Sequence, residues 1–171
     1  MRKVAARDAS AFRTLIERHA ARPHRIAWRM LGDAAEAEDV AQEALLRLWR
    51  TADRWQGGQS GVAAWLTRVA TNLCLDRIRR GRPIAEERVP ERADPAPLAD
   101  AALAAEQGRQ QVIAAMGALP ERQRAAIVLT YYEELPNATA ASMLDMNIKA
   151  FESLLLRARR ALKATLVTDN D

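Results

Sequence analysis

Residues 119–166 read LPERQRAAIVLTYYEELPNATAASMLDMNIKAFESLLLRARRALKATL and predict three helices separated by two breaks. Pro120 stands at the expected first helical position, where its missing N–H costs nothing. Pro136 ends that helix and leaves Asn137 to cap the next one. Asn147 closes a short turn and is placed to cap a long last helix. A short helix, a tight turn and a longer basic helix predict a helix-turn-helix DNA reader, although a helical hairpin that only packs a core fits the same spacing.

The composition predicts an all-α protein built from two small helical domains. The chain has 171 residues, 49% of them hydrophobic, and Ala, Leu, Arg and Glu dominate while β-branched runs are absent. A single Cys excludes an intrachain disulfide framework and indicates a reducing compartment. No apolar run approaches the roughly 18 residues of a membrane span, and the N-terminus lacks the apolar core of a secretory signal. We therefore expect a cytoplasmic protein.

Charge divides the chain into three parts. Residues 1–82 hold 16 Lys/Arg and 9 Asp/Glu, for a net charge of +7, and residues 83–106 hold 2 and 6, for −4. Residues 107–171 hold 8 and 7, for +1. The middle part is rich in Pro and Ala, which predicts a flexible acidic linker between the two domains. The basic first part suits a polyanionic partner, though a solvated basic surface would have the same composition.

An acidic and polar face is predicted on the helix that follows Asp33. Asp39, Gln42 and Glu43 are spaced i, i+3, i+4, so they share one side of this helix. A docking surface for a basic protein partner would have this character. A solvated face stabilised by pairs such as Glu43 with Arg47 would have it too, and the residues alone favour that second interpretation.

A face suited to single-stranded bases is predicted on the helix from residue 63 to 82. Aromatic rings stack on bases, amides read base edges and guanidinium groups neutralise phosphates. The face continues a Gly-rich loop that begins after Trp55, and a buried Trp65 with solvated arginines is the alternative. Its candidate residues are Trp55, Gln56, Trp65, Arg68, Asn72, Asp76, Arg79 and Arg80.

Other candidate chemistry is weak. His19 and His24 lie five residues apart with no carboxylate or Cys in register, so we expect no metal site. Cys74 reads as a small buried side chain. With no nucleophile–base pair and no phosphate loop, the sequence predicts neither an enzyme nor a cofactor.

Three segments together resemble a known family. GDAAEAEDVAQEALLRLW (residues 32–49) looks like the second conserved region of bacterial sigma factors, and AWLTRVATNLCLDRIRR (residues 64–80) looks like its continuation. Residues 118–162 look like the fourth conserved region. Sigma factors with only these two regions and a short linker form the extracytoplasmic-function (ECF) group of the sigma-70 family.

The resemblance assigns roles to the candidate residues. Residues 1–82 would be region 2, in which Asp39, Gln42 and Glu43 dock on the clamp helices of the largest subunit of core RNA polymerase. The candidate single-strand face would bind and melt the minus-ten promoter element. Residues 107–171 would be region 4, which reaches the polymerase flap and the minus-thirty-five element. The expected contacts there are Asn147, Lys149, Glu152, Ser153, Arg157 and Arg160.

The resemblance implies a sigma factor that directs promoter-specific initiation, in a stress or envelope response and under the control of an anti-sigma factor. Two alternatives remain. A sigma-like decoy could sequester an anti-sigma factor without reading DNA, but it would not need the Trp65 and Asn72 face. A dimeric helix-turn-helix regulator would explain the last stretch and leave the first 82 residues without a role.

Overall fold

The computed structural model describes residues 1–55, 61–81 and 100–168, with the backbone alone for residues 100–107, 109 and 168. All regular structure in these ranges is helical, which confirms the all-α prediction. The acidic linker prediction falls mostly on residues 82–99, outside the described residues. Within those described ranges, no helix is both long and apolar enough to cross a bilayer.

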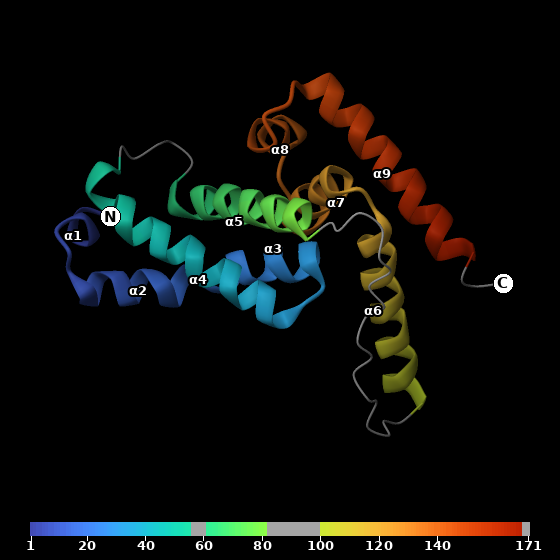
Figure 1. Ribbon diagram of the computed structural model, residues 1–171, viewed down its shortest axis with the longest axis horizontal. Helices are drawn as coiled ribbons and strands as arrows, with labels where there is room; N and C mark the ends of the chain where they lie inside the picture. The colour runs from blue at the N-terminus through green and yellow to red at the C-terminus, as the bar shows by residue number, and fades with distance from the viewer. Residues whose placement is uncertain (56–60, 82–99, 169–171) are drawn as a thin grey trace.

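The N-terminal bundle is built on α3, α4 and α5, with the other elements at one end (Figure 1). Its core includes the fully buried side chains of Ile26, Met30, Val40, Leu48 and Leu66. Burying large apolar side chains on facing helices is the main source of stability in such a bundle. In chain order the elements are α1 (Arg2–Ala5), α2 (Ala9–His19), α3 (Ala21–Leu31), α4 (Ala34–Thr51), the 3₁₀ turn η1 (Ala52–Arg54) and α5 (Gly61–Arg80).

The turn between α3 and α4 follows the expected chemistry. Gly32 ends α3 with φ 70°, a left-handed conformation that glycine adopts without strain. Asp33 then caps α4, and its Oδ1 accepts the backbone N–H of Glu36 at 2.8 Å. Proline is common at the first position of a helix, so the sequence predicts a start at Pro23. The helix begins two residues earlier, at Ala21, and Pro23 is buried in its first turn. Proline is tolerated there since first-turn N–H groups need no intrahelical acceptor.

The C-terminal unit packs α7 and α8 against α9 around the fully buried ring of Phe151. Its elements are α6 (Asp100–Ala118), α7 (Glu121–Ile127), the π-helical turn η2 (Val128–Tyr132), α8 (Asn137–Met143) and α9 (Ile148–Thr168). The three helical segments expected after Leu119 are present, with η2 extending α7. Figure 1 shows α6 and α9 extending from α7 on the side away from α1 and α2.

The helix starts in the C-terminal unit correct two expectations and confirm a third. Asn147 caps α9 as expected, since its Oδ1 accepts the Ala150 N–H at 2.8 Å. Asn137 is already helical in α8, and the N-cap is Pro136 with extended backbone (φ −55°, ψ 143°). Pro120 likewise caps α7 instead of occupying its first turn. Proline fixes φ near −65°, which suits both positions, so the sequence could not separate them.

The two units pack on one another. Helix α3 contacts α6, α7 and η2, and α5 contacts α7. The guanidinium of Arg124 on α7 donates to the Met30 carbonyl at the end of α3, to the Gly117 carbonyl at the end of α6 and to the Leu119 carbonyl just after α6. Helical spacing predicts Ile113 in the core of the C-terminal unit, but its side chain is 38% exposed and lies beside Gly32 at the end of α3.

Replacing Asn147 with Ala removes the cap of α9 and should lower the free energy of unfolding by about 1 kcal/mol. Asn137→Ala is the matched control, because this Asn caps nothing and the loss should stay within about 0.5 kcal/mol. Urea unfolding followed by circular dichroism measures both. Equal losses in the two variants would contradict the capping assignment.

Candidate nucleic-acid interface

A groove of about 380 Å³ runs between α4 and α5. Asp39, Gln42 and Glu43 line it together, as their helical spacing predicts. Asp76 and Arg80 line the same groove from α5, so two residues predicted for single-stranded DNA lie beside the predicted docking acids. The remaining lining residues are Leu46, Arg47, Leu73 and Arg77.

Arginines organise the acids of this groove. Arg47 Nε lies 2.7 Å from Glu43 Oε1, and this hydrogen bond lowers the pKa of the Glu43 carboxyl. Arg77 on α5 reaches the Glu36 carboxylate and stands 4.0 Å from Asp39 Oδ2. The Asp39 side chain nevertheless remains 67% exposed. The expected Glu43–Arg47 pair is therefore present, and it leaves Asp39 open to a partner.

The aromatic part of the single-strand face is a pair of tryptophans. The rings of Trp55 and Trp65 meet edge to face, with centroids 5.9 Å apart and an interplanar angle of 69°. Both are half-buried and pack against the core. Trp65 is thus part core and part surface, intermediate between the two interpretations of the sequence. Gln56 lies outside the described residues.

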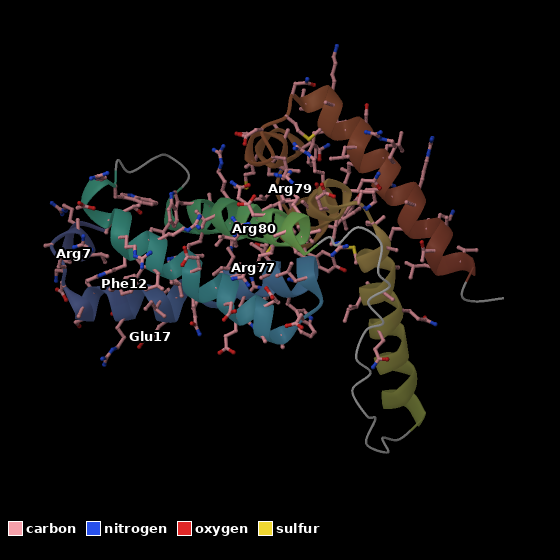
Figure 2. All side chains as sticks on the ribbon, in the orientation of Figure 1. Arg7, Phe12, Glu17, Arg77, Arg79 and Arg80 are labelled. Atoms are coloured by element: carbon pink, nitrogen blue, oxygen red, sulfur yellow. The ribbon has the colours of Figure 1, made fainter. Side chains whose placement is uncertain are left out.

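Two arginines predicted to meet DNA are paired with carboxylates of the C-terminal unit. Arg68 Nη2 lies 2.7 Å from Asp145 Oδ1, and Arg79 Nε lies 3.9 Å from Glu121 Oε1. Asn72 between them is exposed. Figure 2 shows Arg79 with Arg77 and Arg80 at the end of α5 that approaches α7. Sequence reasoning missed these pairs, because no local pattern predicts contacts between distant helices.

Helix α9 presents a polar stripe opposite its buried side. Phe151, Leu154 and Ala158 face the core. The side-chain oxygen of Asn147 accepts the backbone N–H of Ala150 at the start of α9. The other predicted contacts are all exposed: Lys149, Glu152, Ser153, Arg157 and Arg160.

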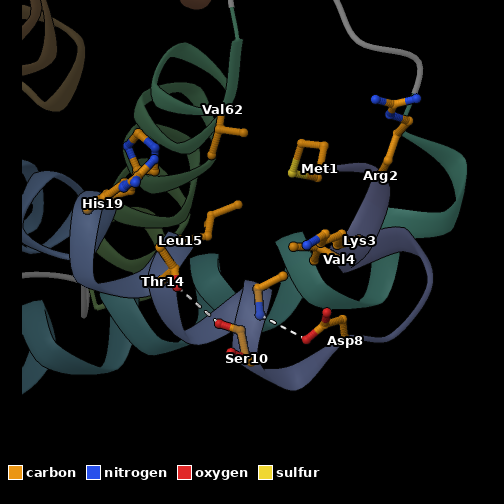
Figure 3. A pocket seen from close by; sticks show the side chains of 12 residues that line it. Met1, Arg2, Lys3, Val4, Asp8, Ser10, Thr14, Leu15, His19 and Val62 are labelled. Carbon is orange, nitrogen blue, oxygen red and sulfur yellow. Dashed lines mark hydrogen bonds between the residues drawn. The ribbon is translucent and has the colours of Figure 1, made fainter.

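A second hollow, of about 720 Å³, opens between α1, α2 and the start of α5 (Figure 3). Its lining includes Lys3, Arg18 and His19, with Val62 on the side of α5. The sequence predicted nothing here, since these cations are scattered over short helices without a recognisable spacing.

The described side chains were compared with the needs of a metal ion and of a reactive thiol. No three His, Cys, Asp or Glu residues in those ranges come close enough to hold a metal ion. Cys74 is fully buried, and burial raises the pKa of its thiol to about 12. A thiol with so high a pKa is a poor nucleophile at neutral pH because the thiolate is scarce.

Comparison with known proteins matches both halves of the chain. The protein family described as "Sigma-70 region 2" matches residues 15–84, and the family described as "Sigma-70, region 4" matches residues 109–162. The chain is 35% identical to the ECF RNA polymerase sigma factor SigL of Mycobacterium tuberculosis, covering 95% of this chain and 92% of SigL. It is 31% identical to the ECF RNA polymerase sigma factor SigK of Mycobacterium sp., over 97% of this chain and 88% of SigK. It spans 59% of SigE of Mycolicibacterium smegmatis at 33% identity, covering 87% of this chain.

Solved structures share the fold. CnrH, solved in complex with the cytosolic domain of CnrY, superposes with a TM-score of 0.72 and 26% identity over 98% of this chain and 94% of CnrH. The sigma factor RpoE of Bartonella quintana, solved in complex with the anti-sigma factor NepR, superposes with a TM-score of 0.69 and 23% identity. That superposition covers 94% of this chain and 99% of RpoE. Each superposition covers both units at once.

Cys74 should resist alkylation in the folded protein. The shift of its pKa from 9.0 to about 12 lowers the thiolate fraction at pH 8 by about 10³, and burial also blocks the reagent. Iodoacetamide should therefore label the native protein at least about 100-fold more slowly than the protein in urea. Mass spectrometry of quenched samples measures both rates, and comparable rates would contradict the buried thiol.

Proposed function

Because the chain belongs to the ECF RNA polymerase sigma factors, we propose that it binds core polymerase through the α4–α5 groove and reads promoter DNA with α5 and α9. The observation that carries this assignment is that one chain presents exposed acids on α4, a tryptophan pair beside α5 and exposed cations on α9. A decoy that only captured a regulator would not need the last two surfaces.

The docking surface on polymerase consists of Asp39, Gln42 and Glu43. Asp39 is largely exposed, and the Arg47 guanidinium keeps Glu43 ionised to lower pH by lowering its pKa. Exposed carboxylates steer a basic partner and fix its orientation more than they add affinity. Leu46, 46% exposed in the same groove, supplies the apolar contact that a stable interface needs at its centre.

The exposed face of α5 binds and melts the minus-ten element. Base stacking on an aromatic ring is worth about 1–3 kcal/mol per base, which is enough to hold a few base pairs open. Trp65 is the stacking platform, supported by its edge-to-face contact with Trp55. Asn72 reads a base edge, and Arg68, Arg79 and Arg80 hold the phosphates of the displaced strand.

The minus-thirty-five element is read by the exposed stripe of α9 in the major groove. Lys149 and Arg157 contact phosphates or base edges, with Ser153 between them. Arg160 lies further along the helix, where it meets the DNA backbone, and Glu152 accepts from a cytosine amino group. The C-terminal unit would also bind the polymerase flap.

Control by an anti-sigma factor extends the same proposal. The complex of RpoE with NepR supports it by analogy. Exposed apolar side chains at Trp28, Tyr131 and Leu156 are available to a clamping protein. We place the protein in the cytoplasm, in a stress or envelope response and without enzymatic activity. Co-purification from unstressed cells should recover a small inhibitory protein together with polymerase.

The double variant Asp39→Ala/Glu43→Ala should weaken binding to core polymerase at least about tenfold, because two steering carboxylates are lost. Glu38→Ala is the matched control, since Glu38 is exposed on the same helix but does not line the groove. Fluorescence anisotropy of the labelled protein titrated with core enzyme measures both. Equal affinity of the double variant and the control would overturn the docking assignment.

The two DNA surfaces should respond differently to salt. Lys149→Ala should weaken duplex binding and reduce the slope of log K against log salt by about 1, because one phosphate contact is lost. Trp65→Ala should instead slow open-complex formation by polymerase with that slope nearly unchanged, since stacking releases no counterions. Permanganate footprinting on a cognate promoter measures opening. A Lys149 variant with the full wild-type slope would contradict the phosphate contact.

A further inference from the structure

The turn between α1 and α2 carries an arginine at a position where glycine is usual. Arg7 has φ 63°, the left-handed backbone conformation that residues other than glycine rarely adopt. The backbone N–H groups of Arg7 and Asp8 donate to the Val4 and Lys3 carbonyls at 2.9 and 3.0 Å, which is the Schellman pattern that ends a helix at a left-handed residue. Glycine fits this position without strain, so a strained arginine here indicates a role for its side chain.

The side chain of Arg7 reaches the C-terminal end of α4. Its Nη1 donates to the Trp49 carbonyl at 2.8 Å, and its guanidinium lies over the Trp49 ring, 5.2 Å from the centroid. The same ring packs on Phe12 of α2, with the centroids 4.7 Å apart. Figure 2 shows Arg7 and Phe12 at the opposite end of the bundle from Arg79. A cation is favoured at the C-terminal end of a helix, where carbonyls lack intrahelical donors.

The Trp49 carbonyl is the point at which α4 tightens into η1. It also accepts the N–H of Ala52, three residues further on, and the Ala52 carbonyl in turn accepts the Trp55 N–H at 3.3 Å. The rings of Trp55 and Trp65 then meet edge to face. A continuous series of hydrogen bonds therefore links the guanidinium of Arg7 to the tryptophan pair.

Helix α1 itself packs on η1. Val4 of α1 and Ala52 of η1 are both buried, at 2% and 1% exposure. The two elements have only 4 and 3 residues, and helical segments so short are not stable by themselves. The path of the chain into Trp55 therefore depends on contacts with the first turn of the protein, and the Arg7 contact is the polar part of them.

We propose that Arg7 is a positioning residue for the single-strand face. By fixing the carbonyl at which α4 becomes η1, it sets the ring of Trp55 against Trp65 and so holds the Trp65 ring for stacking on a base. The proposal rests on the proposed function of α5, and Arg7 acts through the two rings without touching DNA. A ring that is already held loses less freedom when the strand arrives, so this preorganisation raises the rate of promoter opening.

The test uses the Arg7→Gly variant of the full chain, bound to core polymerase. Glycine removes the side chain and favours the left-handed backbone, so the turn between α1 and α2 is kept. Arg13→Ala is the control, because it removes the same charge from an exposed position on α2. Permanganate footprinting measures opening on a promoter that is recovered by mapping transcript starts after overexpression of this protein.

We expect Arg7→Gly to slow promoter opening about three- to tenfold, as the loss of one charged hydrogen bond and one cation–π contact allows. Its affinity for core polymerase should remain that of the wild type, and Arg13→Ala should match the wild type in both measurements. No slowing by Arg7→Gly, where Trp65→Ala does slow opening, would overturn the positioning role.

A double-mutant cycle with Trp65→Ala separates positioning from a general effect on the fold. If Arg7 acts through the tryptophan pair, Arg7→Gly should have no further effect on opening once Trp65 is replaced by Ala. Equal slowing in the two backgrounds, where Trp65→Ala itself slows opening, would show that Arg7 acts elsewhere and would contradict the proposal.

Circular dichroism of the indole bands tests the positioning without DNA. Two indole rings held in contact couple their transitions, so Trp65→Ala should change the spectrum of the wild type more than that of the Arg7→Gly variant. Equal changes would contradict the positioning role. If Trp65→Ala left promoter opening unaffected while the spectral difference was present, the assignment of the melting face would fail and Arg7 would still position the pair.

Discussion

The guanidinium of Arg124 is the contact on which the arrangement of this chain depends. It binds carbonyls at the ends of α3 and α6 and one just after α6, so one side chain joins three helices from both units. Burial lowers the pKa of Arg124, and the hydrogen bonds of its guanidinium go to backbone carbonyls. Backbone carbonyls at helix ends are the natural substitute, because they lack intrahelical donors and carry the negative end of the helix dipole. Removing the side chain would leave three carbonyls without this donor, each costing about 1–3 kcal/mol where water cannot replace it.

Helix α5 is the element that the two units share. Its buried side, with Leu66 and Ala70, belongs to the N-terminal core, and its exposed side carries Trp65 and Asn72. Its C-terminal half contributes Arg77 to the acidic groove of α4 and Arg79 to the contact with α7. A single helix thus fixes the proposed docking acids relative to the proposed melting face. This explains why the groove contains Asp76 and Arg80, which sequence spacing had assigned to DNA alone.

The helical elements and their caps could be read from the sequence because their signals are local. Asp33 and Asn147 cap the helices they precede, and Gly32 ends α3, since each needs only its neighbours in the chain. The predicted cap at Asn137 was wrong because Pro136 takes the N-cap position, and proline fits both the cap and the first turn of a helix. The residues of the exposed stripe of α9 were expected from the resemblance to the fourth conserved region. The pairs Arg68–Asp145 and Arg22–Glu133 could not be predicted, because they join residues 77 and 111 positions apart whose contact depends on how whole helices pack.

A polar interface between the units suits a protein that must change partners. An apolar interface of the same extent would hold the units together irrespective of salt or competing anions. The exposed carboxylate–arginine pairs at the edge of this interface are weak in water and exchange readily with other anions. The buried side chains of Arg124 and Glu133 give the packing of the two units a defined geometry. Within the described residues, the buried atoms Arg124 Nε and Glu133 Oε1 have no hydrogen-bond partner, which limits how firmly the units hold. The same polar side chains give the interface a specific geometry and a modest strength. Hydrogen bonds fix the relative direction of the two units, and desolvation of the charged groups offsets most of the energy of those bonds.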